Sequence, residues 1–163
     1  MSGPSREKGA QRAVQVTAQP VLLWTDMSLL GHDPMDDMHQ EFVHLVAALQ
    51  TSPDRELSKG LDEVLRHLKR HFGEEEAWMQ ESDYPATDCH VAEHAAVMAS
   101  GNAVRQALDR GDVLLCRRFA DELAGWFPGH ANYLDAPLAH WLSKKRFGAR
   151  PLVFRRNAVE TAA

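Results

Sequence analysis

Histidine and carboxylate side chains recur at helical spacing in the middle of this chain. His90 and His94 lie four residues apart in the stretch CHVAEHAAVMASG, and His71 and Glu75 repeat that spacing. Four residues turn an α-helix by about 400°, so the members of each pair share one face, one turn apart. Imidazole nitrogens and carboxylate oxygens are common metal ligands, so each pair is a candidate part of a metal site.

Three further residues extend this candidate set to seven: His39, His130 and Asp135. One pair at this spacing means little in a chain with nine histidines. The whole set is a stronger indication of a metal site than any one pair, because it spreads over four predicted helices at similar heights. Such side chains are costly to bury on an inward helix face unless they are paired or bind a metal.

Four segments with apolar residues three or four positions apart predict the helices that carry these residues. They span about 36–50, 56–81, 89–110 and 113–142, and the stretches TSPDRE, SDYPATD and GD separate them. No segment has the alternating pattern of a strand. The sequence predicts an all-α fold, an antiparallel up-down-up-down four-helix bundle with an N-terminal arm and a C-terminal extension.

Positions along the predicted helices indicate that the candidate ligands converge. His71 lies about 12 residues before the turn near Asp83, and His90 about 7 residues after it, which at about 1.5 Å per residue places them within two turns in height. His39 lies about 14 residues before the first turn, and His71 about 17 after it, so these heights also agree to roughly one turn.

Length and charge suggest a single cytoplasmic domain. The 163 residues carry a net charge of −5, which argues against nucleic-acid binding. The first 20 residues lack the apolar core of a signal peptide, no run is long enough to span a membrane, and two cysteines are too few for a disulfide framework. We expect a monomer in a reducing cytoplasm.

Three regions are predicted along the chain. They are a flexible arm (1–20), the helical bundle (21–143) and a basic C-terminal extension (144–163). Residues 144–156 hold six basic residues and no acidic one. This stretch is either a solvated end or a docking segment for an acidic protein partner.

The composition of the candidate site favours two ions over one. Five imidazoles and two carboxylates exceed the roughly four ligands of a structural zinc ion, so a mononuclear zinc bundle is the weaker alternative. Seven ligands suit two octahedral ions if both carboxylates and one solvent oxygen bridge them, and one position then stays open. A nitrogen-rich set favours Fe(II), and hence reversible O2 binding over O–O cleavage.

The chain resembles the hemerythrin family, in particular the single-domain bacterial members, over roughly residues 22–142. The matching motifs are DDMH ending at His39, HFGEEEAWM at 71–79, YP at 84–85, HVAEH at 90–94, and then Trp126, His130 and Asp135 in order.

The resemblance implies a four-helix bundle around two non-haem iron ions with an oxo or hydroxo bridge. His90, His94 and His130 would ligate one iron, and His39 and His71 the other, whose sixth position would stay open for O2. Glu75 and Asp135 would bridge the two ions. Phe72 and Trp126 would line the ligand pocket, although plain core packing also explains both aromatic residues.

Three functional interpretations follow. The first is a non-enzymatic protein that binds O2 reversibly for transport, storage or sensing. The second is a di-iron oxidoreductase acting on peroxide, nitric oxide or Fe(II), which an open iron position permits. The third is an interaction module in which the bundle reports O2 or redox state to a partner bound by the arm and the basic extension.

Other residues near the motifs raise further expectations. Pro128 lacks a backbone donor and is expected to kink the last helix around Ala124 to Trp126, and His130 and Asp135 lie an awkward five residues apart. His67 forms a rival pair with His71, for which a surface or outer-sphere role is expected. Of the run 74–76 only Glu75 should point inward. The remaining candidates should be ordinary surface or half-buried residues outside the site: His32, His44, Cys89 and His140.

Overall fold

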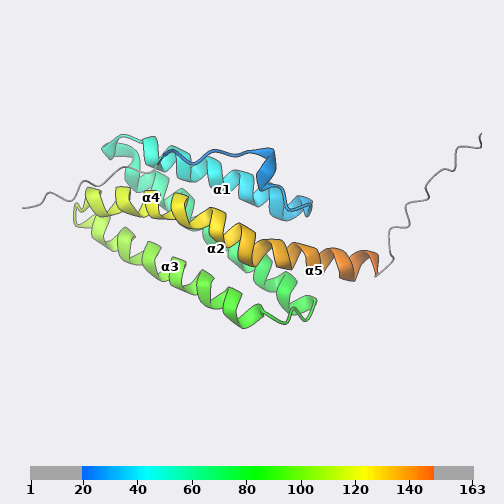
Figure 1. Cartoon of the computed structure of the whole chain (residues 1–163). Helices are drawn as coiled ribbons and strands as arrows, with labels where there is room; N and C mark the ends of the chain where they lie inside the picture. The colour runs from blue at the N-terminus through cyan, green and yellow to red at the C-terminus, as the bar shows by residue number, and fades with distance from the viewer. Residues whose placement is uncertain (1–19, 149–163) are drawn as a thin grey trace, which may run out of the picture.

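The computed structural model describes residues 20–148 of the chain (Figure 1). Four long helices form its body: α1 (Asp33–Thr51), α2 (Leu57–Glu81), α3 (Thr87–Asp109) and α4 (Val113–His130). A π-helical turn, η3 (Ala131–Asp135), joins α4 to α5 (Ala136–Phe147). Two short 3₁₀ turns, η1 (Asp26–Ser28) and η2 (Asp54–Glu56), precede α1 and α2. No strand occurs in this range, so the predicted all-α class is confirmed.

The helices form the predicted antiparallel four-helix bundle. Helix α1 packs against α2 and α4, and α3 packs against the same two neighbours. In Figure 1, α4 and α5 continue as one rod whose orange end projects beyond α1. The blue segment before α1 runs along that helix, and its Leu22 N–H donates to the Gln50 side chain at 2.9 Å.

Helix α1 begins three residues earlier than the sequence analysis predicted. Pro34, which precedes the predicted start of this helix, lies in the first helical turn. Proline is tolerated there because the first backbone N–H groups have no partner within the helix. The Asp36 carboxylate accepts hydrogen bonds from the backbone N–H groups of Leu30 (2.7 Å) and Gly31 (3.0 Å). These bonds hold the entry into α1, where Gly31 has a φ of +78°.

Two apolar clusters fill the interior of the bundle. The larger one lies at the end formed by the second half of α1 and the first halves of α2 and α4, with Phe42, Leu61 and Phe119 among its members. The smaller cluster lies towards the other end and contains Met35, Met79, Leu138 and Ala139. On α1, α2 and the α4–α5 rod, the candidate metal ligands fall largely between the residues of these two clusters.

The last helix changes its hydrogen-bonding pattern after His130. Ala124 and Trp126 are within α4, which continues to His130 with Pro128 inside it. The backbone then widens into the π turn, in which the Ala136 N–H donates to the Ala131 carbonyl five residues earlier. The π turn is a local distortion between His130 and Asp135. A kink around Ala124 to Trp126 stays a prediction.

The predicted arm and basic extension fall almost entirely outside the described residues. Helix α5 continues to Phe147, so Lys144, Lys145 and Arg146 form its last turn. Residues 1–19 and 149–163 are not part of the described structure, and the division of the chain into three regions stays a prediction. None of the helices in the described range has the length and apolar character needed to cross a membrane.

Candidate metal centre

The seven side chains selected from the sequence meet in one buried layer of the bundle. None of them exposes more than 4% of its surface, and Glu75 and Asp135 expose none. They come from all four helices of the bundle and from the π turn. The set comprises His39, His71, Glu75, His90, His94, His130 and Asp135.

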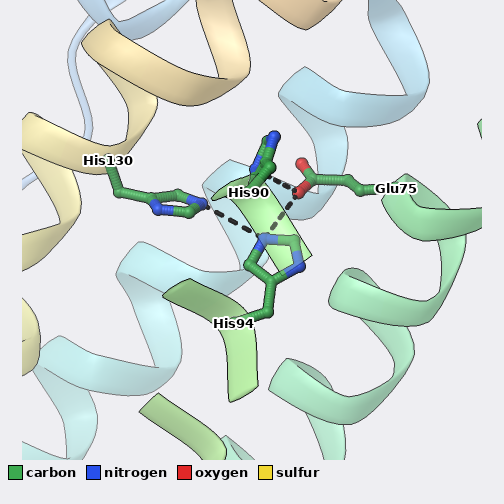
Figure 2. Close-up of side chains that lie close together, drawn as sticks. All are labelled: Glu75, His90, His94 and His130. Atoms are coloured by element: carbon green, nitrogen blue, oxygen red, sulfur yellow. Dashed lines mark hydrogen bonds and ion pairs between the residues drawn. The ribbon is translucent and has the colours of Figure 1, made fainter. Parts of the chain in front are cut away.

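Glu75 separates the histidines into two sets. Its Oε1 lies 3.0 Å from His71 Nε2 and 3.9 Å from His39 Nε2. Its Oε2 lies 3.2 Å from His94 Nε2 and 3.5 Å from His90 Nε2. Figure 2 shows His90 and His94 pointing towards this carboxylate and His130 pointing towards His94.

Asp135 repeats the same division from the opposite helix. Its Oδ2 lies 3.1 Å from His39 Nε2, whereas its Oδ1 lies 3.0 Å from His90 Nε2 and 3.2 Å from His130 Nε2. Each carboxylate therefore offers one oxygen to the pair on α1 and α2 and the other oxygen to the three histidines on α3 and α4. We call these groups the two-histidine half and the three-histidine half.

Many polar side-chain atoms in this layer have no hydrogen-bond partner. Five of the converging atoms have no hydrogen-bond partner in the described structure: His39 Nε2, Glu75 Oε2, His90 Nε2, and both Asp135 carboxylate oxygens. Buried polar atoms are normally paired, so such a concentration of unpaired atoms requires a physical reason. The ligand atoms converge without completing their hydrogen bonds, which is the arrangement expected around bound cations.

Two groups of these residues bring their ligand atoms close enough to hold an ion. One atom from each of Glu75, His90, His94 and His130 lies within 4.8 Å of the others, and the same holds for His39, His71 and Glu75. The donor set of imidazole nitrogens and carboxylate oxygens suits iron.

The π turn places His130 and Asp135 on the same face. Five residues of a regular α-helix rotate the side chain by about 140° beyond one full turn, which would separate the two ligands. A π turn instead closes its hydrogen bond over five residues, so positions i and i+5 lie above one another. The five-residue spacing in the sequence is thus accommodated by the backbone and does not disrupt the layer.

Electrostatics keep both carboxylates ionised in this layer. Burial alone would raise the pKa of Glu75, but the adjacent imidazoles of His71, His90 and His94 overcome this effect and lower it. Burial opposes the ionised form of Asp135 too, yet His130, His39 and His90 hold its pKa well below the usual value. Charged carboxylates are the form that binds a cation.

Aromatic rings cover the histidines on one side. Phe72 stacks on His94 with ring centroids 3.9 Å apart and planes 8° apart, and Trp126 lies 4.3 Å from His130. Trp126 donates its indole N–H to Glu93 Oε1 at 2.8 Å. The sequence analysis missed Phe127, whose ring meets His39 edge-on at 5.1 Å. Its position next to Trp126 was the available signal, but neighbouring residues on a helix ordinarily point in different directions.

His67 is buried, so the surface alternative for it was wrong. It exposes 3% of its surface and lies next to His71. It belongs to neither group of converging ligand atoms. Burial, together with the adjacent His71, lowers the pKa of His67 to about 4 despite the nearby Glu41 carboxylate. This geometry does not support the pair His67–His71 as an alternative to the ligand pair His71–Glu75.

The acidic run and the other histidines lie as expected. Of residues 74–76 only Glu75 is fully buried, while Glu74 is exposed. Glu76 is half-buried, and its Oε1 lies 3.6 Å from His94 Nδ1, on the side of the ring away from the converging atoms. His32 is half-buried, and the rest are exposed: His44, Cys89 and His140.

Comparisons with known proteins agree with this arrangement. Residues 30–137 match the family model described as the hemerythrin HHE cation binding domain. The chain is 34% identical over 131 residues to a protein of Ralstonia nicotianae named bacteriohemerythrin, covering 80% of this chain and 96% of that protein. The chain belongs to the hemerythrin family. A bacteriohemerythrin of Stenotrophomonas maltophilia is 32% identical over 139 residues, covering 78% of this chain and 91% of that relative. No solved structure matches.

Membership of the hemerythrin family indicates what the buried layer binds. The family model describes cation binding, and hemerythrins bind non-haem iron. The clustered imidazoles and carboxylates of this chain are consistent with such a site. The protein is therefore a hemerythrin-type metal-binding protein.

Proposed function

We propose that this protein binds O2 reversibly at a non-haem di-iron centre held by the seven residues of the buried layer. One observation carries the proposal. Glu75 and Asp135 each direct one oxygen to His39 or His71 and the other oxygen to histidines of α3 and α4. Two carboxylates that each face two separate sets of imidazoles are suited to bridge two metal ions, whereas a single ion would draw all the ligands to one point.

The two halves supply different numbers of ligand atoms. The two-histidine half offers two imidazoles and two carboxylate oxygens, while the three-histidine half offers three imidazoles and two oxygens. With an oxo or hydroxo bridge these become five and six ligands. The iron in the two-histidine half would then keep one open position, which is what a small ligand requires.

The chain's own residues define how such a centre would behave. When bound, the iron pair would supply reversible O2 binding, since neutral imidazoles favour Fe(II). Phe72, Trp126 and Phe127 lie against His94, His130 and His39, and their apolar rings would limit the access of water to the iron pair. Excluding water would protect the reduced state, because protons from water promote release of the oxygen in reduced form, as hydrogen peroxide, which leaves the irons oxidised.

In this proposal the protein serves O2 transport, storage or sensing in the cytoplasm. It acts as a monomer and not as an enzyme. We further propose that the chain functions as a bundle with an arm at 1–20 and a basic extension at 144–163. The extension, which begins with Lys144, Lys145 and Arg146 at the exposed end of α5, would dock an acidic protein partner.

Spectroscopy of the purified protein tests the proposal. The protein is reduced without air, exposed to O2 and then degassed, while the visible spectrum is recorded. A ligand-to-iron band that appears with O2 and disappears on degassing is expected. Two irons per chain with irreversible oxidation, together with turnover of peroxide or nitric oxide, would instead favour the oxidoreductase alternative.

A further inference from the structure

A groove lies on the surface between α3 and α4, and we call it the α3–α4 groove. Its volume is about 350 Å³, and it is open to solvent. Four residues give it an apolar lining: Val97, Phe119, Leu123 and Trp126. Phe119 and Leu123 also belong to the larger apolar cluster, so the groove exposes part of the bundle's apolar interior.

The charged residues that line the α3–α4 groove are both glutamates. Glu122 is exposed on α4, and Glu93 is half-buried on α3, where its Oε1 accepts the indole N–H of Trp126 at 2.8 Å. Neither carboxylate forms an ion pair with a residue in the described range 20–148. An apolar groove that carries two such carboxylates is complementary to a segment that combines apolar side chains with a cation.

The described chain begins beside α4. The Pro20 carbonyl accepts a hydrogen bond from Gln50 Nε2 at 3.4 Å, and the same nitrogen donates to Asp121 Oδ1 at 3.0 Å. Asp121 precedes Glu122 of the groove in α4. A helix with its side chains is about 10–12 Å wide, and an extended chain advances about 3.3 Å per residue. Roughly four residues before Pro20 are therefore enough to cross α4 and reach the groove.

The sequence that comes within this reach has the chemical character that the groove requires. Residues 12–16 read RAVQV, and residues 1–19 contain three basic side chains and one acidic one. Alternate side chains of an extended segment point to the same side. One side of an extended segment here would therefore present one cation and two apolar groups: Arg12, Val14 and Val16.

The basic C-terminal extension does not reach the groove of its own chain. Trp126 is the groove residue of α4 nearest to α5, and at about 1.5 Å per residue roughly 33 Å of the α4–α5 rod separates it from Gly148. Even a fully extended chain from Gly148 to Arg156 spans at most about 29 Å. Residues 157–163 contain no lysine or arginine. The basic segment within reach is therefore the one before Pro20.

We propose that residues 12–16 dock as an extended segment in the α3–α4 groove of their own chain, with the two valines on the apolar lining and Arg12 beside the glutamates. The covalent link to the bundle keeps the segment at a high local concentration, so a modest contact is sufficient. Trp126 lies 4.3 Å from His130, and the docked segment would shield this aromatic cover of the three-histidine half. The inference goes beyond the proposed function and does not depend on the bound metal.

Photo-crosslinking of the full-length protein tests the inference. Val14→p-benzoylphenylalanine introduces a benzophenone, which on illumination bonds to C–H groups in contact with it. Unlabelled and isotope-labelled protein are mixed before illumination, and mass spectrometry of the linked peptides shows which residues are joined and whether they belong to one copy. Two matched pairs of variants are compared in this background. They are Val16→Asp with Gln15→Asp, and Glu122→Lys with Glu81→Lys, which changes an exposed glutamate at the end of α2.

The links should join the segment to the groove residues of α3 and α4 within one copy. Val16→Asp should lower their yield about tenfold, because it places a charge on the apolar lining. Gln15→Asp adds the same charge on the opposite side of the segment and should keep most of the yield. Glu122→Lys should lower the yield about threefold, whereas Glu81→Lys should leave it unchanged.

Three results would overturn the inference. Links that map to other surfaces of the bundle would show that the segment does not occupy the groove. Links mainly between copies would assign the groove to a second molecule. Equal losses in Val16→Asp and Gln15→Asp would show that the segment has no apolar side facing the groove.

Discussion

The larger apolar cluster and the histidine–carboxylate layer are built on the same helices, yet they differ in what completes them. Leu61, Val64 and Phe119 lie buried against other apolar side chains, so at this end of the bundle the protein supplies its own packing partners. In the layer, His39 Nε2 and Glu75 Oε2 are buried without hydrogen-bond partners. The apolar end therefore supplies most of the free energy of folding. The bundle holds the side chains of the layer in place, and a bound cation would pair with their unpaired polar atoms.

This difference means that the two regions should respond to opposite perturbations. Removing apolar contacts should lower stability without changing metal binding. Removing a ligand should abolish metal binding without unfolding the bundle, because the free energy of folding comes mainly from apolar burial.

The largest expected effect is the loss of iron from Glu75→Ala. Glu75 lies between both sets of histidines, so its removal takes one ligand from each proposed ion. Iron should fall from two per chain to nearly none, while the helical circular dichroism spectrum persists. Glu74→Ala, which changes the exposed neighbour, is the matched control. Two irons per chain in Glu75→Ala would contradict the assignment of Glu75 as a bridging ligand.

The second effect is on stability and lies at the apolar end. Leu61 is fully buried, so Leu61→Ala should lower the free energy of unfolding by about 2–5 kcal/mol in urea titrations. Iron content should stay at two per chain. Leu114→Ala, at an exposed position on α4, should change stability by less than about 0.5 kcal/mol. A loss of iron in Leu61→Ala at a temperature where it is folded would show that the two regions are not separable.

A smaller effect is expected from the side chain behind His94. Glu76 Oε1 lies 3.6 Å from His94 Nδ1, where a carboxylate can orient the ring and raise its basicity. Glu76→Gln should weaken iron binding roughly tenfold in competition with a chelator, with stoichiometry unchanged at saturating iron. The exposed Glu74→Gln variant serves for comparison. Equal affinities of the two variants would mean that Glu76 merely lies close to the ring.

The smallest effect concerns the two cysteines. Cys116 is buried in the larger apolar cluster, and burial raises the pKa of its thiol against the opposing charges of Arg105 and Arg117. Cys89 is exposed, so iodoacetamide should label it first, as mass spectrometry of the peptides can show. Chelation of the iron should leave Cys116 protected. Rapid labelling of Cys116 after iron removal would show that the apolar end depends on the metal.

The amino-acid sequence predicted the bundle and the convergence of the ligands because both depend on regular helical spacing. Apolar residues three and four apart defined the four helices, and the pairs His71–Glu75 and His90–His94 share faces by the same rule. The heights of His39 and His71 followed from the lengths of the helices between short turns.

The remaining errors arose where the backbone departs from that regularity or where burial depends on the far side of a helix. The first helix was predicted to begin after Pro34, although the first helical turn tolerates proline. The π turn itself was not predicted, since sequence spacing does not determine where an extra residue is accommodated. Phe127 was missed, and the surface alternative for His67 was wrong, because their partners, His39 and Phe42, come from another helix.

Crystallographic anomalous scattering measured at the iron absorption edge tests the central claim most directly. The account predicts two iron peaks within the buried layer, one between His39 and His71 and the other among His90, His94 and His130, with Glu75 and Asp135 contacting both. A single peak, or a peak ligated by His67 in place of His39, would contradict it.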